Sequence, residues 1–301
     1  GSISSEIYPD MPQYPYGLAS GMVSSFVVEP IVTTAPLSSK PEKEDLVIYE
    51  ILLRDFVHPH SYAVLQDTLD YLQRLGINAI QLMPVQEFEG NEGWGYNPSY
   101  HMALDKDYGS ADALRALVEE CHSRGMAVIL DVVYNHAFGQ SPLALLYWDG
   151  AQNRPAANNP WLNPIPKHDF NVGNDFNHES PATKYFVKRV ISWWMQTYGI
   201  DGFRFDLASG FTQRNSLGNF NEWARYDTSR INNIQEYADL MWSIDPESYV
   251  ILENFVDNSE RKELSSRGMM LWGNMSIEYG QASKGFGGSD LGGSWWEHVG
   301  W

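Results

Sequence analysis

The sequence is poor in cysteine, in long apolar runs and in positive charge, and each shortage excludes a class of protein. With Cys121 as the only cysteine, no disulfide within the chain is possible; this residue lies on the apolar face of a predicted helix, as small core residues do. No apolar run reaches the length of a membrane span. Only 20 Lys and Arg stand against 38 Asp and Glu, and the net charge of -18 argues against nucleic acid or an anionic membrane as partner.

What the chain has is length and aromatic side chains. Its 301 residues, 43% of them hydrophobic, suffice for one large α/β domain with a substantial core. The 11 Trp and 17 Tyr suit a cleft for flat, partly apolar ligands such as sugars, although many of these rings will belong to the core. No secretory leader pattern is recognisable, which leaves the compartment open, with an extracellular or periplasmic location favoured over the cytoplasm.

Residues 1–45 differ from the rest of the chain. Proline and serine recur there, and Pro41-Glu42-Lys43-Glu44 is typical of a linker, so we expect an N-terminal arm or the remnant of an upstream domain. From residue 46 to residue 301, short apolar runs alternate with helical patterns. We expect helices after Ser61, Ser110 and Ser180, and strands at 46–53, 77–83, 127–133, 202–207, 249–253 and 269–272.

The expected strands are continuously apolar, which is typical of parallel strands buried on both faces. A doubly wound sheet and a (β/α)8 barrel both fit this rhythm. The carboxylates favour the barrel, because Asp131, Asp206 and Glu253 each end a different strand, and strand ends converge on one rim of a barrel. A doubly wound sheet would need a glycine-rich turn after its first strand, and residues 53–56 do not provide one.

The strand at 202–207 carries Arg204 and Asp206 on one face, because side chains alternate along a strand. A buried pair of this kind is either a core ion pair or part of a site. In a site, Arg204 would lower the pKa of Asp206, as a nucleophile requires. Glu253 ends an apolar strand with no cation nearby in sequence, so desolvation would raise its pKa, as a general acid requires; the alternative is a surface or helix-capping carboxylate. Retaining glycoside hydrolysis uses two such carboxylates about 5–5.5 Å apart.

Two more clusters carry polar or aromatic groups. Asp131-Val132-Val133-Tyr134-Asn135-His136 precedes an irregular excursion, residues 137–179. The side-chain oxygen of Asn135 could ligate Ca²⁺, and His136 could bond a substrate hydroxyl, although a lone histidine is more often structural. In Trp94-Gly95-Tyr96-Asn97-Pro98, glycine and proline shape a turn that could present Tyr96 to a sugar ring; the alternative is a loop anchored by two aromatic side chains.

Together these motifs resemble those of the α-amylase family, glycoside hydrolase family 13. The segment 131–136 is similar to the family's first conserved region, 202–206 to the second and Glu253 to the third. The Trp-Gly-Tyr-Asn-Pro form of the loop at 94–98 is closer to debranching and branching relatives than to simple α-amylases. The resemblance covers residues 47 to 272.

The resemblance implies a (β/α)8 barrel with residues 137–179 as a short domain B. It implies Asp206 as nucleophile and Glu253 as acid/base of a retaining glycosidase acting on α-glucans such as starch, glycogen and maltooligosaccharides, with no cofactor required. The side chains expected to bind the substrate are Tyr96, His136, Arg204, Asp131 and Trp94.

Two departures from the family's pattern limit these expectations. Ser209 and Gly210 stand where many α-amylases have Lys-His, whose backbone often serves the calcium site, so Asn135 alone points to Ca²⁺. No Asn-His-Asp type motif follows Glu253, although the family's fourth region supplies a third catalytic carboxylate. We therefore expect a truncated domain with about six of eight strands, whose two open edges could lead to self-association. An α-glucan transferase of the branching type and a non-catalytic α-glucan-binding chain stay open as alternatives.

Overall fold

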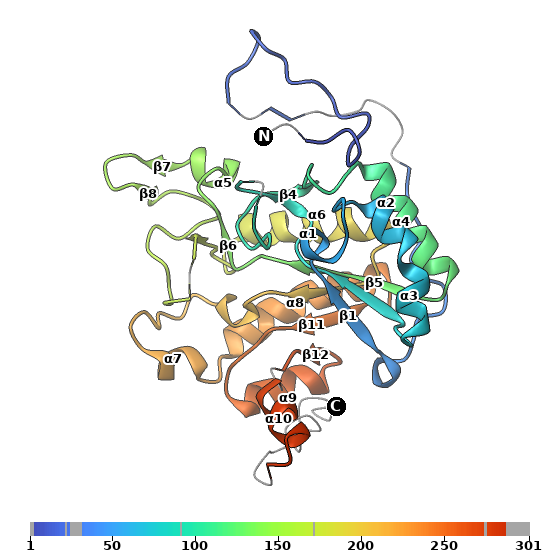
Figure 1. The fold of residues 1–301 in the computed structure, drawn as a ribbon. Helices are drawn as coiled ribbons and strands as arrows, with labels where there is room; N and C mark the ends of the chain where they lie inside the picture. The colour runs from blue at the N-terminus through green and yellow to red at the C-terminus, as the bar shows by residue number, and fades with distance from the viewer. Residues whose placement is uncertain are drawn as a thin grey trace.

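Six parallel strands form the centre of the molecule and follow one another across the sheet in chain order (Figure 1). The computed structural model describes residues 3–21, 23–24, 32–90, 92–170, 172–273 and 276–286. Each strand pairs in parallel with its neighbour in the sheet. The strands are β1 (Ile48–Ile51), β2 (Ala79–Leu82), β5 (Ala127–Val132), β10 (Gly202–Phe205), β11 (Tyr249–Leu252) and β12 (Met270–Leu271).

This order decides between the two fold classes. A doubly wound sheet reverses its strand order at a switch point, whereas the strands here proceed in one direction, as in a (β/α) barrel. Within the described residues β1 and β12 are the edges of the sheet, and no pairing joins them. The six-stranded parallel half-barrel confirms the prediction of an incomplete (β/α)8 fold, while association through its edges stays a prediction.

Helices follow the strands and begin where the sequence predicts. Ser61, Ser110 and Ser180 each accept a hydrogen bond from a backbone N–H of the first turn, which satisfies a donor that a helix start leaves free. The helix expected after Ser61 is broken into two at Thr68, whose hydroxyl donates to the Leu65 carbonyl at 2.7 Å. The helices are α1 (Leu53–Phe56), α2 (Tyr62–Asp67), α3 (Leu69–Arg74), α4 (Ala111–Ser123), α6 (Pro181–Tyr198), α8 (Thr228–Ile244) and α9 (Asn258–Ser266).

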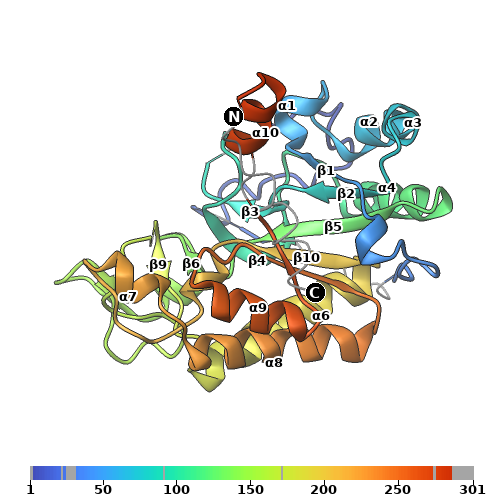
Figure 2. The same ribbon diagram turned by 90° about the horizontal axis from the view of Figure 1, so that it is seen from below.

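The helices cover the outer face of the sheet, and a separate apolar cluster that includes Ile129, Tyr249 and Ile251 lies on the inner face. Helices α2, α4, α6 and α8 contact one another in that order, and Cys121 is buried in this layer as predicted (Figure 2). On the inner face, a Cβ at Gly202 would lie 2.5 Å from the Tyr249 carbonyl oxygen. Glycine there leaves room for Tyr249, whose hydroxyl donates to the Pro41 carbonyl at 2.5 Å. The sheet is thereby joined to the N-terminal segment.

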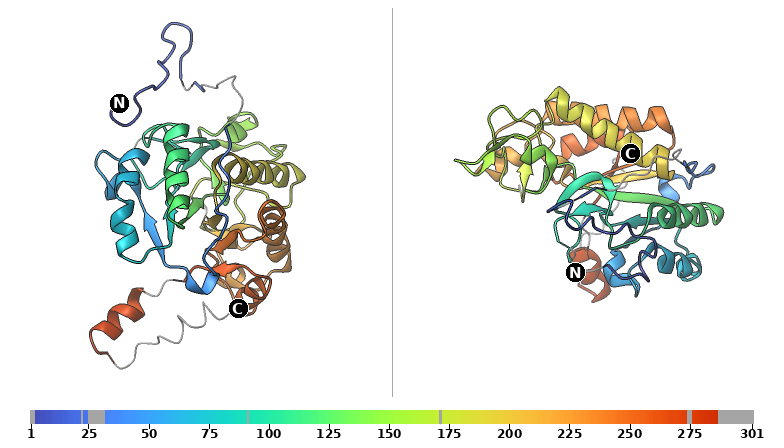
Figure 3. Two further views of the ribbon diagram at one scale, coloured as in Figure 1. Left: turned by 90° about the vertical axis from the view of Figure 1, so that its right-hand side faces the viewer. Right: turned by 90° about the horizontal axis from the view of Figure 1, so that it is seen from above.

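The N-terminal segment is fixed to the sheet by a buried ion cluster. Residues 32–46 run down the molecule to the short helix η1 (Lys43–Asp45) and β1 (Figure 3, left). The Lys40 side chain is 3% exposed, and its Nζ lies 3.4 Å from Asp201 Oδ1 and 2.6 Å from Asp245 Oδ2. Asp201 also accepts from the Leu37 N–H at 2.8 Å and contacts His122 Nε2 at 2.7 Å. The assignment of residues 1–45 as an arm or domain remnant stays a prediction.

Replacing Lys40 by methionine is expected to lower the free energy of unfolding by about 2 kcal/mol, because two buried carboxylates lose their shared cation while Asp201 keeps its other donors. Lys106→Met is the matched control: Lys106 pairs with Glu87 on the surface, 33% exposed, and such a pair contributes less than about 1 kcal/mol. Urea denaturation of both variants measures the difference. Equal effects would show that the cluster does not hold the segment.

The remaining elements are short and gather beyond the carboxyl ends of the strands. Two hydrogen bonds hold the excursion, residues 137–179, against the segment just before α7 (Figure 2). The Ser216 N–H donates to the Lys167 carbonyl at 2.7 Å, and the Gly218 N–H donates to the Asp169 carboxylate at 2.8 Å. The assignment of the excursion as domain B stays a prediction. No helix of the described residues combines the length and apolarity that a membrane crossing requires. These short elements are β3 (Gln86–Phe88), β4 (Pro98–Leu104), β6 (His136–Ala137), α5 (Pro142–Leu145), β7 (Trp148–Asp149), β8 (Arg154–Pro155), β9 (Asn174–Asp175), η2 (Ala208–Gly210), α7 (Phe220–Ala224) and α10 (Ser276–Ser283).

Candidate active site

Arg204 joins three carboxylates from three neighbouring strands. Its position on β10 is level with Asp131 on β5, so their side chains meet on the inner face. Arg204 Nη1 donates to Asp131 Oδ1 at 3.0 Å and to Asp206 Oδ1 at 2.9 Å, and Nη2 lies 3.2 Å from Glu253 Oε1. The structure thus brings the two predicted catalytic carboxylates to one guanidinium at one rim of the half-barrel.

Strand β10 is shorter than predicted, and its end aims a backbone donor at Glu253. The strand stops at Phe205, and Leu207 has a left-handed backbone, φ 43° and ψ 46°, at the start of η2. This conformation is unusual for a residue with a side chain. It directs the Leu207 N–H to Glu253 Oε2 at 2.9 Å, and the next N–H, of Ala208, donates to the Glu253 carbonyl at 2.9 Å. The turn after Asp206 therefore positions Glu253.

The charge of Asp206 differs from the expectation. Burial, and then the negative charge of Asp131, raise the pKa of Asp206 to about 8, although Arg204 opposes this. Burial likewise raises the pKa of Asp131 to about 7. The predicted lowering of the Asp206 pKa is therefore wrong, because burial outweighs the one guanidinium, which Asp206 shares with Asp131 and Glu253. Because Asp206 and Asp131 lie on one guanidinium, their titrations are coupled.

The expected surroundings of Glu253 are also wrong. The sequence places no cation near it, but Arg204, 49 positions earlier in the chain, lies 3.2 Å away. Folding brings this cation to Glu253 because β10 and β11 are neighbours in the sheet. The two carboxylates consequently differ less in environment than the sequence predicts, and each has Arg204 as a partner.

The aromatic loop and the β5 end supply the remaining predicted side chains. The Tyr96 hydroxyl donates to Asp131 Oδ2 at 2.7 Å. Trp94, two residues earlier in the same loop, has an exposed side chain. His136 is fully buried, with Nε2 2.8 Å from the Tyr96 carbonyl and Nδ1 3.1 Å from Asn135 Nδ2. Both ring nitrogens of His136 thus have partners within the protein, and burial lowers its pKa. Its contact with a substrate hydroxyl stays a prediction.

Trp272 was not predicted as part of the site. The centre of the Arg204 guanidinium lies 5.4 Å from the centroid of the Trp272 ring, in a cation–π contact, and Phe255 packs on the same tryptophan at 5.9 Å. Trp272 ends the sixth predicted strand. Its signal in the sequence is an aromatic side chain at the end of an expected strand, where only polar side chains were considered.

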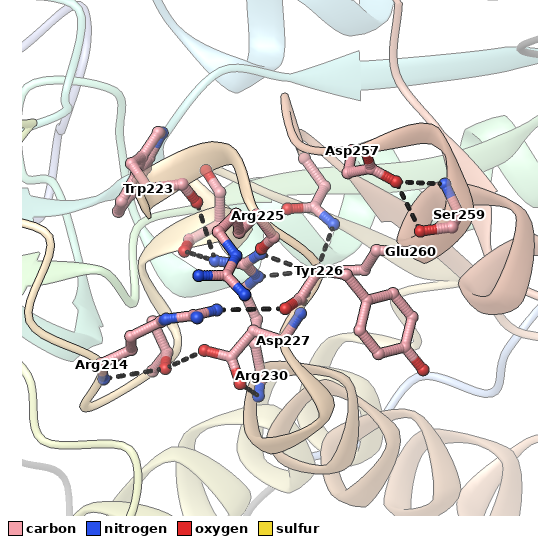
Figure 4. Close-up of polar contacts among 12 residues, drawn as sticks. Arg214, Trp223, Arg225, Tyr226, Asp227, Arg230, Asp257, Ser259 and Glu260 are labelled. Atoms are coloured by element: carbon pink, nitrogen blue, oxygen red, sulfur yellow. Dashed lines mark hydrogen bonds and ion pairs between the residues drawn. The ribbon is translucent and has the colours of Figure 1, made fainter. Parts of the chain in front are cut away.

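A second group of residues that the sequence did not reveal centres on Arg230 and Glu260 (Figure 4). Arg230 and Glu260 form a fully buried ion pair, with Arg230 Nε 2.7 Å and Nη2 2.6 Å from the carboxylate. Glu260 also accepts from Asn254, the residue after Glu253, at 3.2 Å. Arg230 donates to the Ser209 carbonyl of η2 at 3.1 Å. The pair thereby connects the turns that follow both candidate catalytic carboxylates.

A cavity of about 360 Å³ lies beside this group. Exposed rings of Phe220 and Phe255 line it together with polar groups of Arg225 and Asp257, from α7 and from the loop after β11.

The calcium prediction rests on Asn135, whose Oδ1 is buried without a hydrogen-bond partner among the described residues. Calcium takes six to eight oxygen ligands. Here the neighbouring groups include the imidazole of His168, and the described residues contain no cluster of three or more His, Cys, Asp or Glu side chains that could hold a metal. This donor set does not fit Ca²⁺.

A parallel half-barrel with carboxylates gathered at the carboxyl ends of its strands is the architecture of barrel enzymes. Comparison with known proteins shows which family the chain is similar to. Residues 63–143 match the family profile described as alpha amylase, catalytic domain. The chain is therefore homologous to part of the catalytic domain of the α-amylase family, as its motifs indicate.

Three relatives illustrate this similarity. A malto-oligosyltrehalose trehalohydrolase of Saccharolobus solfataricus is 34% identical over 56% of this chain and 28% of its own length. The chloroplastic isoamylase SU1 of Zea mays is 34% identical over 58% of this chain and 26% of its own length. The fold matches type I pullulanase of Bacillus subtilis, solved with maltose, with a TM-score of 0.64 and 23% identity over 82% of this chain and 38% of that one. The chain spans about a quarter of the length of the curated relatives it matches.

Proposed function

We propose that this chain carries the nucleophile and the acid/base of a retaining glycosidase acting on α-glucans. The observation that supports it is the convergence of Asp206 and Glu253 on the guanidinium of Arg204, from the ends of adjacent parallel strands. Two carboxylates of different role at one bond are what retention of configuration requires. The relatives named isoamylase and pullulanase, and the maltose in the pullulanase structure, support α-glucans as the substrate class.

In this proposal Glu253 protonates the leaving glycosidic oxygen while the Asp206 carboxylate attacks the anomeric carbon. A covalent glycosyl ester forms on Asp206, and water activated by Glu253 then releases the sugar and restores both groups. This mechanism requires Asp206 to be ionised and Glu253 to carry the proton in the reacting complex. Arg204 orients both carboxylates, and Tyr96 and Trp94 provide aromatic surface for the glucosyl ring.

Azide distinguishes the two roles. Glu253→Ala with α-maltosyl fluoride, whose fluoride leaves without an acid, is expected to form the ester on Asp206 slowly and to be accelerated by azide. Azide attacks the anomeric carbon and releases the Asp206 carboxylate, so the product is the α-configured maltosyl azide, identified by NMR. A β-configured azide would assign Asp206 and Glu253 the opposite roles.

The glucan-binding alternative has a distinct outcome. Calorimetric binding of maltohexaose, with turnover of starch equal to that of Asp206→Asn, would favour a binding chain. New α-1,6 linkages among the products would favour the branching-type transferase. Neither result depends on the azide experiment, because neither uses the Glu253→Ala variant.

A further inference from the structure

Four buried groups from three segments of the chain meet between β5, the excursion and η2. Asn135 and Asp175 lie on adjacent chain segments, where the Phe176 N–H donates to the Asn135 carbonyl at 3.1 Å. His168 Nε2 lies 3.4 Å from Asp175 Oδ1. A Cβ at Gly210 would overlap Asn135 Oδ1 and lie 2.9 Å from His168 Nε2, so the backbone of η2 closes the group from the other side.

Two oxygens of this group lack hydrogen-bond donors. Asp175 Oδ2 accepts from Asn163 Nδ2 at 2.8 Å and from the Lys167 N–H at 3.1 Å, but Asp175 Oδ1 and Asn135 Oδ1 are buried without a hydrogen-bond partner among the described residues, and so are both ring nitrogens of His168. Leaving buried acceptors without a partner costs free energy. The nearest positively polarised group is the imidazole of His168, itself 1% exposed.

His168 is held in this place by its other contacts. Its ring lies on Trp223 of α7, with centroids 4.3 Å apart and planes inclined by 42°. Trp223 in turn is fixed by its carbonyl, which accepts from buried Arg230 at 3.3 Å. The imidazole therefore occupies the position beside Asn135 Oδ1 and Asp175 Oδ1 as part of the packed structure.

We propose that His168 takes the place of a divalent cation in this chain. In this proposal an N–H at Nε2, which lies 3.4 Å from Asp175 Oδ1, is the donor for the Asp175 and Asn135 oxygens and holds the β5 end, the excursion and the turn after Asp206 together without a metal. The imidazole nitrogen excludes Ca²⁺, which prefers oxygen ligands. This arrangement does not depend on the proposed catalytic function.

The experiment follows thermal unfolding by tryptophan fluorescence in EDTA and in CaCl₂. The unmodified protein is expected to have the same Tm in both and to contain no stoichiometric calcium by elemental analysis. His168→Ala is expected to lower the Tm in EDTA by about 5 °C, because the two oxygens lose their donor. Calcium can then enter, and CaCl₂ is expected to restore about half of that loss.

Two variants serve as controls. His168→Gln retains an N–H donor in a side chain of similar reach, so it should lose less stability and show no response to calcium. Asn135→Ala, added to His168→Ala, should remove the calcium response. A lower Tm of the unmodified protein in EDTA, or about one bound calcium per chain, overturns the proposal, as does a His168→Ala variant with unchanged Tm. If His168→Ala fails to fold, the measurements on the unmodified protein decide.

Discussion

Asp206→Asn is expected to abolish hydrolysis of α-glucans and, at the same time, to stabilise the fold. Loss of the nucleophile removes the covalent step, and the loss of one strongly coupled catalytic group costs about three orders of magnitude or more in kcat. The stabilisation follows from the environment of Asp206, which is buried against two other carboxylates. Asparagine has nearly the same shape and no charge to desolvate.

The stabilisation should depend on pH with a definite sign. The pKa of Asp206 is raised to about 8 in the folded protein, against about 3.9 in an unfolded chain. The neutral carboxyl is favoured by folding, so its contribution to stability is complete below about pH 4 and is lost as the pH rises towards 8. The advantage of Asp206→Asn is therefore absent near pH 4 and largest at pH 8 and above.

Because solvent and Arg204 reduce the full effect, we expect a gain of about 1–2 kcal/mol at pH 8, or roughly 3–6 °C in Tm. Asp67→Asn, an exposed position in α2, is the matched control and should leave both activity and Tm unchanged. Thermal unfolding of the three proteins between pH 4 and pH 9 measures the effect. A stabilisation that is greatest at pH 4 would contradict the electrostatic argument, and unchanged hydrolysis would contradict the role of Asp206.

The parts of this structure that local sequence determines were predictable. Apolar runs and serine caps predict the strands and helices, and the parallel order then brings Asp131, Asp206 and Glu253 to one rim. The sign of the Asp206 pKa shift was not predictable in this way, because Asp131 lies 75 positions away and its distance depends on the register of β5 and β10. The relation of Glu253 to Arg204 was missed for the same reason.

Residues whose role depends on a tertiary contact are still harder to recognise in the sequence. His168 in the excursion and Trp223 in the short helix α7 lie 55 positions apart, and no spacing rule connects them. Arg230 is a charged side chain in α8, and its burial becomes visible only when α9 supplies Glu260.

The Arg230–Glu260 pair provides the test of how the two catalytic turns are held. Glu260 is fully buried and accepts from the Asp227 N–H at 2.8 Å in addition to Arg230 and Asn254 (Figure 4). Removing its carboxylate leaves the Arg230 charge buried with only carbonyl groups as partners. Breaking a buried pair in this way costs about 3–5 kcal/mol.

Glu260→Ala is accordingly expected to lower the free energy of unfolding by about 3–5 kcal/mol, measured by urea denaturation. Glu263→Ala is the matched control on the same helix: Glu263 pairs with Arg267 at the surface, and its loss should cost less than about 1 kcal/mol. Glu260→Gln retains acceptor and shape and should fall between the two. Glu260 accepts from Asn254, the residue after Glu253. Glu260→Gln should therefore also lower kcat more than it changes KM, whereas Glu263→Ala should change neither. If Glu260→Ala is as stable as Glu263→Ala, the carbonyl groups around Arg230 are enough to stabilise the buried guanidinium. The turns after Asp206 and Glu253 would then be positioned only by the hydrogen bonds from the Leu207 and Ala208 N–H groups to Glu253.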